Sequence, residues 1–261
     1  MRPAATEHQR VELILRSEHR DASALAIAVA ARDPQAVIVF NPRPGEGEAL
    51  TAGGVPAAAW LIPPSPTPRE RPLLTPYTSV VATDPATAES AGAEKWTLMA
   101  RPVSDDLFVE SPNFEIIERA FFDGSASARR DRVLQPVKHQ FDVLHLVSGA
   151  SHAQLRELMA RCQLAIDLQG EAGIPARDRV GPALAAGLLV LAESPSAQPG
   201  LIEREHLVTF SSPDELELLI SDALVEPGSF SQIRSAGRQA AEQRRSSVVL
   251  NRLANELLAG A

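Results

Sequence analysis

Short apolar runs that end at or near a proline characterise the first part of the chain. Three of them are predicted to be buried strands followed by turns: AVIVFNP (36–42), AAAWLIPP (57–64) and TSVVATDP (78–85). A helix is predicted before them over residues 19–34, with Asp21 or Ser23 as its N-cap. Pro34 stops this helix. The proline-dense stretch 63–76 is predicted to be a loop.

Strands and helices alternate more regularly in the second part. Strands are predicted over residues 118–125, 141–149, 163–170, 188–194 and 206–212. Helices are predicted over residues 129–138, 152–162 and 212–227. A short helix is predicted within residues 177–193, which contain GPALAAG, and two more helices are predicted within residues 229–260. Such alternation indicates a parallel sheet with right-handed crossovers.

We therefore expect an α/β protein with two Rossmann-like domains whose parallel sheets face a cleft. The first, reduced domain would span residues 1–112, and the second would span residues 113–261 with the terminal helices. The stretch PVSDDLFVE (102–110) is predicted to be the crossover between them. Its paired aspartates, Asp105 and Asp106, fit a linker turn better than a catalytic pair.

The composition is that of an ordinary globular protein, with 44% hydrophobic residues in a chain of 261. A net charge of −8 argues against a nucleic-acid partner. No apolar run approaches the roughly 20 residues of a membrane span, and the N-terminus lacks the apolar core of a signal peptide. Cys162 is the only cysteine and lies in an apolar run, which favours a buried inert thiol. We expect a cytoplasmic protein.

A candidate anion-binding loop lies in FFDGSASARR (121–130). A glycine between a strand and a helix lets backbone N–H groups face a phosphate, and Arg129 and Arg130 could add charge-assisted contacts. The alternative is an ordinary turn with solvated arginines. The same design recurs at Gly149, where Ser151 is a plausible helix cap and His152 either contacts a ligand or faces solvent.

Acidic residues supply candidates for catalysis. Asp167 lies near the end of a predicted strand, where open α/β sheets place their ligands, and Glu171 lies in the charged loop that follows. Asp84 and Glu46 follow strands of the first part and could act as a general base, although a turn-forming Asp-Pro also explains Asp84. The histidines show no metal-ligand spacing, so no metal is expected.

The last predicted helices carry four arginines. Arg234, Arg238, Arg244 and Arg245 are expected to form a solvated helix face.

Several of these segments together resemble a known family. They are FFDGSASARRDRVL, VSGASHAQLRELMARCQLAIDL, RDRVGPALAAGLLVLAE and HLVTFSSPDELELLISDAL, with PAAAWLIPPSPTP, VVATDP and RPVSDDLFVE in the first part. Their order resembles the GT-B-fold glycosyltransferases, in particular the branch of spore-maturation glycosyltransferase-like proteins. The resemblance implies a nucleotide-sugar donor bound to the second domain and an acceptor in the interdomain cleft.

The same resemblance assigns roles residue by residue. Gly124, Ser125 and Arg130 match the loop that binds the donor phosphates. Arg179 matches the arginine that opens the signature helix, while Gly187 and Glu193 match the ends of that helix and of the next strand. The candidate donor-binding residues are Gly124, Ser125, Arg129, Arg130, Gly149, Arg179 and Glu193. The resemblance implies no cofactor and no metal, because arginines and helix N-termini stabilise the leaving diphosphate in such enzymes.

Pro182 departs from the pattern of this family. Retaining members commonly carry two glutamates separated by seven residues, and the second opens the signature helix and binds the donor ribose. Pro182 and Ile174 stand at those positions here. Two functions therefore remain open, with Asp84 or Glu171 as the candidate catalytic carboxylate of the first. One is a glycosyltransferase that moves a sugar from a nucleotide sugar to an unknown glycan, protein or small molecule. The other is a non-catalytic GT-B-like binding or partner protein that has lost donor chemistry.

Overall fold

The computed structural model describes residues 14, 18–63, 66–67, 69–109, 119–147, 149–169, 178–194 and 199–260. The chain forms two compact units. The first comprises residues up to Met99 together with Leu250–Ala261, and the second comprises Ala100–Val249. The expected domain boundary between residues 112 and 113 falls in 110–118, outside the described residues. The end of the last helix belongs to the first unit, whereas the sequence had placed it in the second domain.

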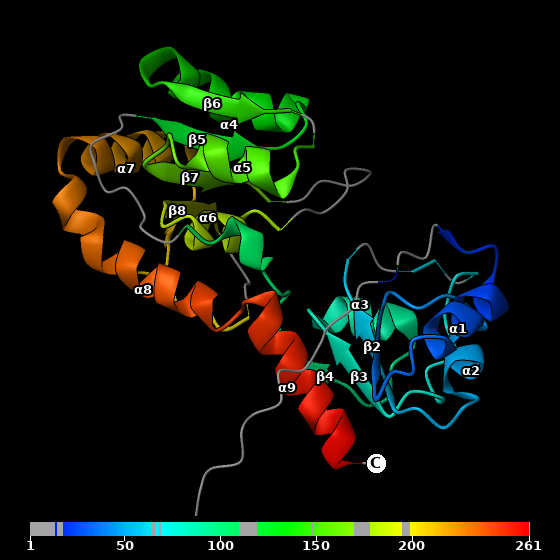
Figure 1. Ribbon diagram of the computed structural model, residues 1–261. Helices are drawn as coiled ribbons and strands as arrows, with labels where there is room; N and C mark the ends of the chain where they lie inside the picture. Colours follow the sequence, from blue (N-terminus) through cyan, green and yellow to red (C-terminus); the bar gives the residue numbers. More distant parts are fainter. Residues whose placement is uncertain are drawn as a thin grey trace, which may run out of the picture. The chain divides into compact units, whose positions relative to one another are not determined.

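The first unit contains a four-stranded parallel sheet of order β1-β2-β3-β4 (Figure 1). Its elements are α1 (Ala22–Ala30), β1 (Val37–Phe40), α2 (Glu46–Thr51), β2 (Ala57–Leu61), β3 (Ser79–Ala82), α3 (Pro85–Ala91) and β4 (Thr97–Leu98). The three strands and the first helix predicted from the sequence are confirmed, and Asp21 is the N-cap of α1. The short elements α2, α3 and β4 were not predicted.

The second unit contains a five-stranded parallel sheet of order β6-β5-β7-β8-β9 (Figure 1). Its strands are β5 (Ala120–Asp123), β6 (Val143–Leu146), β7 (Leu164–Asp167), β8 (Leu189–Glu193) and β9 (Val208–Phe210). Its helices are η2 (Asp105–Leu107), α4 (Ala128–Gln140), α5 (His152–Met159), α6 (Val180–Ala185), α7 (Pro213–Val225), η3 (Pro227–Phe230) and α8 (Ser231–Glu242), and α9 (Ser246–Ala259) begins in it. All five strands predicted for this part are confirmed.

Helices cover both faces of the second sheet, which is what a parallel sheet requires. Successive strand residues point to opposite faces, so Phe121 and Phe122 belong to different cores. The core around Phe122 includes Leu134 of α4 and Leu216 of α7. The core around Phe121 includes Met159 of α5 together with residues of α6. The two cores pack against opposite faces of the second sheet and hold its strands in position.

The strand order of the second sheet reverses between β5 and β7. From β5 the chain adds β6 on one side and then returns to add β7 on the other. Ligands of open α/β sheets bind outside the carboxyl ends of the strands at such a reversal. The described strands of the first sheet lie in sequence order without a reversal. The topology therefore favours the second unit as the location of a ligand site.

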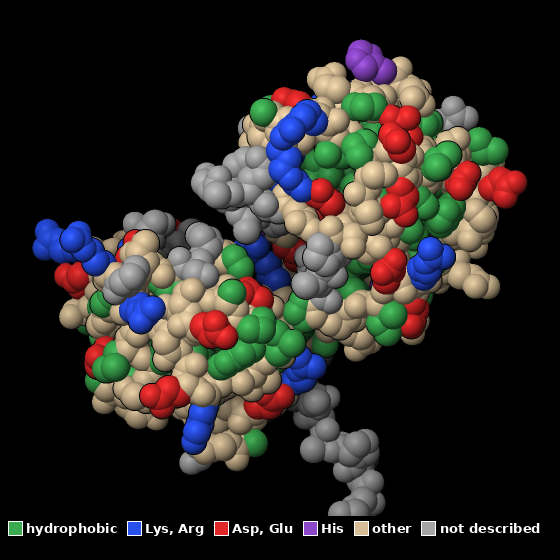
Figure 2. Space-filling view, turned by 180° about the vertical axis from the view of Figure 1, so that it is seen from behind, with side chains coloured by type: hydrophobic (Ala, Val, Ile, Leu, Met, Phe, Trp, Pro, Cys, Tyr) green, Lys and Arg blue, Asp and Glu red, His purple; other side chains and the backbone are tan. Residues whose placement is uncertain are grey.

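Two general features complete the description. Within the described ranges, no helix is long and apolar enough to cross a membrane. On the face drawn in Figure 2, Lys and Arg side chains are scattered among Asp and Glu side chains. The described residues visible on that face form no continuous basic patch.

Helix α8 packs closely at Gly237, and a mutation tests this contact. A Cβ atom at residue 237 would lie 2.5 Å from the backbone oxygen of His206 and 2.7 Å from Cδ2 of Leu184. Gly237→Ala should therefore destabilise the second unit by about 1–3 kcal/mol, although alanine is normally the better helix former. Urea unfolding followed by circular dichroism measures the change.

Gly228→Ala is the matched control, because no atom lies within 4 Å of a Cβ at that position. It should change the free energy of unfolding by less than about 0.5 kcal/mol. Equal stability of the two variants would contradict the packing described for Gly237.

Candidate functional site

The candidate site lies where the carboxyl ends of the parallel strands of the second sheet meet, which we call the strand edge. Asp123 ends β5, Asp167 ends β7 and Glu193 ends β8. Because these strands are parallel, their carboxyl ends meet at one edge, and three acidic side chains therefore gather at the reversal of strand order. Two arginines compensate this charge: Arg179 contacts the ends of β5 and β7, and Arg129 contacts the end of β8.

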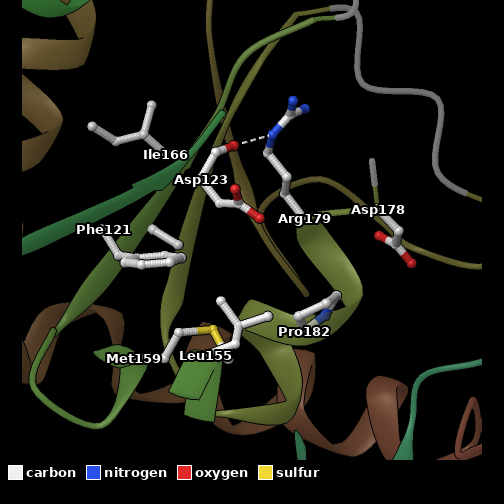
Figure 3. Close-up of a pocket in the computed structure, with 9 residues that line it drawn as sticks. Phe121, Asp123, Leu155, Met159, Ile166, Asp178, Arg179 and Pro182 are labelled. Atoms are coloured by element: carbon white, nitrogen blue, oxygen red, sulfur yellow. Dashed lines mark hydrogen bonds between the residues drawn. The ribbon is translucent and has the colours of Figure 1, made fainter. Parts of the chain in front are cut away.

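Arg179 joins the ends of β5 and β7. Its Nε donates a hydrogen bond to the backbone oxygen of Asp123, which is the dashed line in Figure 3. Its Nη1 lies 3.5 Å from Oδ1 of Asp167 and 3.5 Å from the backbone oxygen of Leu168. The Arg179 side chain is only 8% exposed. The residue that opens α6 thus ties together two strands that the reversal brings side by side.

Asp167 is the acidic partner of Arg179. The pKa of its carboxyl group is raised to about 6, mainly by burial, and the charges of Asp178 and Glu193 contribute to the rise. The charge of Arg179 opposes this rise. Asp167 therefore changes its protonation in the mildly acidic range rather than near pH 4, as an exposed aspartate does.

The loop after β5 is shaped by Gly124 and Arg130. A Cβ atom at residue 124 would lie 2.9 Å from Cζ of Phe122, so only glycine fits there. Arg130 is 1% exposed, and its Nη1 donates to the backbone oxygen of Ser125 at 3.0 Å and to its Oγ at 3.2 Å. Arg130 is therefore not a solvated arginine. It holds the loop from within.

Two residues that the sequence did not single out also support this loop. Nε2 of His145 lies 2.7 Å from the backbone oxygen of Gly124, and Nδ1 lies 2.9 Å from Nζ of Lys138. Since a carbonyl oxygen only accepts, we assign the proton to Nε2, so that Nδ1 accepts from the Lys138 ammonium group. A histidine within a short strand has no distinctive sequence pattern, so this role could only be read from the structure.

Arg129 is the second arginine at the strand edge. Its Nη2 pairs with Oε1 of Glu193, whose Oε2 accepts a hydrogen bond from the backbone N–H of Gln169 at 2.9 Å. Nη1 of Arg129 is enclosed and has no hydrogen-bond partner among the described residues. The Arg129 side chain is one-third exposed, at 33%. Part of the side chain therefore faces solvent, while Nη1 itself is enclosed.

The remaining predicted residues lie elsewhere or outside the described ranges. Gly149 is exposed just before Ser151, whose side chain caps α5, and His152 is exposed. Asp84 is the N-cap of α3 in the first unit, where it accepts from the backbone N–H of Thr87 at 2.8 Å and from its hydroxyl at 2.7 Å. Glu171 lies outside the described residues.

Pro182 lies beside the Arg179 contact and lines a narrow pocket (Figure 3). Its neighbours in this pocket include Phe121, Leu155 and Met159, so its surroundings are largely apolar. The sequence led us to expect Pro182 at the first position of this helix. Helix α6 begins at Val180, however, so Pro182 is its third residue. A proline is tolerated there because the first turn of a helix has no backbone acceptors for its N–H groups.

The expectation that four C-terminal arginines form a solvated face is wrong. Arg234 is 5% and Arg244 7% exposed. Arg234 donates to the backbone oxygen of Gly187 at 3.2 Å, and Arg238 donates to that of Ala185. Carbonyls at the end of a helix carry partial negative charge, so α6 attracts these guanidinium groups.

The pKa of Asp167 makes the stability of the second unit depend on pH. Because the folded-state pKa is raised, ionisation of Asp167 disfavours folding as the pH rises from about 4 to about 6. Asp167→Asn should therefore gain stability relative to the native chain across this window, by up to about 3 kcal/mol, with a constant difference above about pH 7. Urea unfolding from pH 4 to 7 measures it.

Asp106→Asn, at an exposed aspartate, is the control and should leave the pH dependence of the native chain unchanged. A stability difference between Asp167→Asn and the native chain that stays flat from pH 4 to 7 would contradict the buried carboxyl group.

The chain matches no known family model and no curated protein. Solved structures are similar to it in fold. Anabaena Alr3699/HepE in complex with UDP has a TM-score of 0.56 at 15% identity, covering 91% of this chain and 82% of that protein. A glycosyltransferase from Rickettsia africae ESF-5 has a TM-score of 0.60 at 12% identity, covering 96% and 85%. Sucrose-phosphate synthase from Thermosynechococcus elongatus has a TM-score of 0.57 at 12% identity, covering 92% and 78%.

At these identities the similarity establishes the fold alone. It confirms the α/β class with parallel sheets expected from the sequence. The chain thus has the fold of the GT-B glycosyltransferases.

Proposed function

We propose that the chain is a glycosyltransferase that takes a sugar from a nucleotide-diphosphate donor bound to its second unit. The observation that carries the proposal is Arg129, which presents an enclosed guanidinium nitrogen without a partner among the described residues at the strand edge. The fold adds support, because Anabaena Alr3699/HepE was solved in complex with UDP and with UDP-glucose.

The strand edge suits the departure of a diphosphate. In the transfer, the bond between the anomeric carbon and the β-phosphate oxygen breaks, while a hydroxyl oxygen of the acceptor bonds to that carbon and loses its proton. Negative charge then develops on the diphosphate, where fixed donors stabilise it most. The backbone N–H of Ser125 and the guanidinium of Arg129 would supply these donors, since the N–H of Gly124 already donates to the backbone oxygen of Leu146. In this proposal they act in place of a metal ion.

Arg130 and Arg179 would position these groups rather than contact the donor. Arg130 is buried against Ser125, and Arg179 is bound to the backbone of Asp123. The likeness of the 124–130 segment to the spore-maturation branch supports the same loop as the phosphate site. Glu171 follows β7 and is our candidate for the catalytic carboxylate. Asp84 is the weaker candidate, because both of its oxygens are engaged in capping α3.

A non-catalytic GT-B-like binding or partner protein that has lost donor chemistry is the second candidate function, and Pro182 favours it. A proline cannot accept a hydrogen bond from a ribose hydroxyl, and its surroundings in the structure are largely apolar. The two functions differ in turnover.

Binding of UDP tests the site. Calorimetric titration should show UDP binding to the native chain, and Arg129→Met should weaken the binding about 10- to 100-fold, as expected for the loss of a charge-assisted hydrogen bond. Arg132→Met is the matched control, because Arg132 is an exposed arginine on the same helix. It should leave the dissociation constant within about twofold.

Equal affinities of the native chain and Arg129→Met would place the nucleotide elsewhere. Absence of binding for UDP, GDP and dTDP at millimolar concentration would reject the donor site.

Turnover separates the two functions. Incubation with a pool of nucleotide sugars should release free nucleoside diphosphate, more slowly in Arg129→Met than in the native chain, if the chain transfers or hydrolyses the donor. Absence of any release over a day, with and without added sugar acceptors, would instead support the non-catalytic binding or partner protein.

A further inference from the structure

Four arginines lie on or beside α8, and three of them have partners for their side chains. Arg234 donates to Gly187, and Arg238 donates to Ala185 and pairs with Glu242. Arg245 pairs with Glu242 and Asp105, and its Cζ lies 3.8 Å from the ring centroid of Phe108. For Arg244, no side-chain hydrogen bond or ion pair is formed within the described part of the chain.

Arg244 is nevertheless enclosed. The residue is 7% exposed, and its Nε and Nη1 atoms are buried without a hydrogen-bond partner among the described residues. Its backbone is fixed, since the Arg244 carbonyl accepts a hydrogen bond from the N–H of Val103 at 2.7 Å. The next residue, Arg245, forms a β-bridge with Val103. The guanidinium is thus carried by a backbone that two neighbouring contacts hold in place.

The same region includes the residues just before α6. A Cβ atom on Gly181 would lie 2.7 Å from Cγ2 of Val103 and 2.9 Å from Oδ2 of Asp178. The charge of Asp178 acts on Arg244 and opposes the lowering of the Arg244 pKa by burial. Asp178 forms no ion pair with Arg244, and its Oδ1 accepts a hydrogen bond from the backbone N–H of Gly181 at 3.0 Å.

A buried guanidinium without a partner lowers the stability of the folded chain. Its desolvation amounts to several kcal/mol, against a typical total stability of about 5–15 kcal/mol. A phosphate or carboxylate group offsets this penalty most fully, because it neutralises the charge and accepts two parallel hydrogen bonds from the guanidinium fork. A neutral hydroxyl or carbonyl acceptor would leave the charge uncompensated.

We propose that Arg244 is an anion-binding residue, which receives a phosphate or carboxylate group of a small ligand beside the start of α6. This site involves other residues than the strand edge, because Arg244 follows α8 and its backbone contacts Val103. In Figure 3 the carboxyl group of Asp178 points away from the guanidinium of Arg179. The proposal stands independently of the glycosyltransferase function, since none of the strand-edge donors takes part in it.

Thermal unfolding of the full chain in inorganic phosphate tests this site. Sodium phosphate and, in a second series, sodium acetate are titrated at constant ionic strength, and the melting temperature gives the apparent dissociation constant. The measurement is made in the Arg129→Met background, in which the strand edge lacks the Arg129 guanidinium. The variants are Arg129→Met alone and the double variants with Arg244→Met or Arg244→Lys.

In Arg129→Met, phosphate should raise the melting temperature. Arg244→Met should weaken this response about 10- to 100-fold, and without anion it should melt at the same temperature or higher, because an unpaired buried charge has been removed. Arg244→Lys keeps the charge but loses the fork, so it should bind phosphate about tenfold more weakly. If Arg244→Met fails to fold, the phosphate response of Arg244→Lys tests the proposal instead. A response to acetate as well as phosphate would identify a site that also takes carboxylate ligands.

Two outcomes would overturn the proposal. One is a melting temperature that responds to neither phosphate nor acetate. The other is an anion response of equal size in Arg129→Met and in its double variant with Arg244→Met or, if that does not fold, Arg244→Lys.

Discussion

The guanidinium of Arg179 joins two strand ends that the order of the sheet brings together. The chain adds β6 on one side of β5 before it returns to form β7 on the other side. The carboxyl ends of β5 and β7 therefore lie side by side, although the two strands are not consecutive in the sequence. Arg179 bonds to the Asp123 backbone on one side and lies beside Asp167 on the other. The position of the 124–130 loop depends on this bridge, because the loop leaves β5 directly after Asp123. The contact of Arg179 with the two strand ends therefore positions the surface on which the strand edge would bind a ligand.

Buried charge recurs throughout the second unit, and each instance is compensated differently. Arg130 is satisfied by the loop that it supports, and Arg234 and Arg238 by carbonyls at the end of α6. Asp167 is compensated only in part, which is why the pKa of its carboxyl group rises despite the neighbouring guanidinium. Arg129 and Arg244 keep enclosed nitrogens without partners in the described part of the chain. These two arginines are the places where external anions would be most stabilising.

The sequence predicted the strands well because apolar runs bounded by proline, glycine or polar residues are a local signal. Caps such as Asp21 and Ser151 were equally local. The short helix α3 was missed because ATDPATAE is also a good turn sequence, and Asp84 proved to be a cap. Most of the strands and helices could therefore be predicted from local sequence patterns.

The candidate site was predictable only in part. Gly124, Ser125, Arg129, Arg179 and Glu193 could be located at strand ends and helix starts from the sequence, and the structure brings all of them to one sheet edge. The burial of Arg130, Arg234 and Arg244 could not be predicted, because the hydrophobic pattern treats every arginine as a surface residue. Nor could the contact of His145 with Gly124, which joins residues 21 positions apart through strand pairing.

A crystal structure of the chain with UDP bound tests the central claim most directly. The account predicts that the diphosphate lies at the carboxyl edge of the second sheet, in contact with the Ser125 loop and with Nη1 of Arg129. Density for UDP at any other place, with Arg129 unchanged in its contact with Glu193 alone, would contradict it.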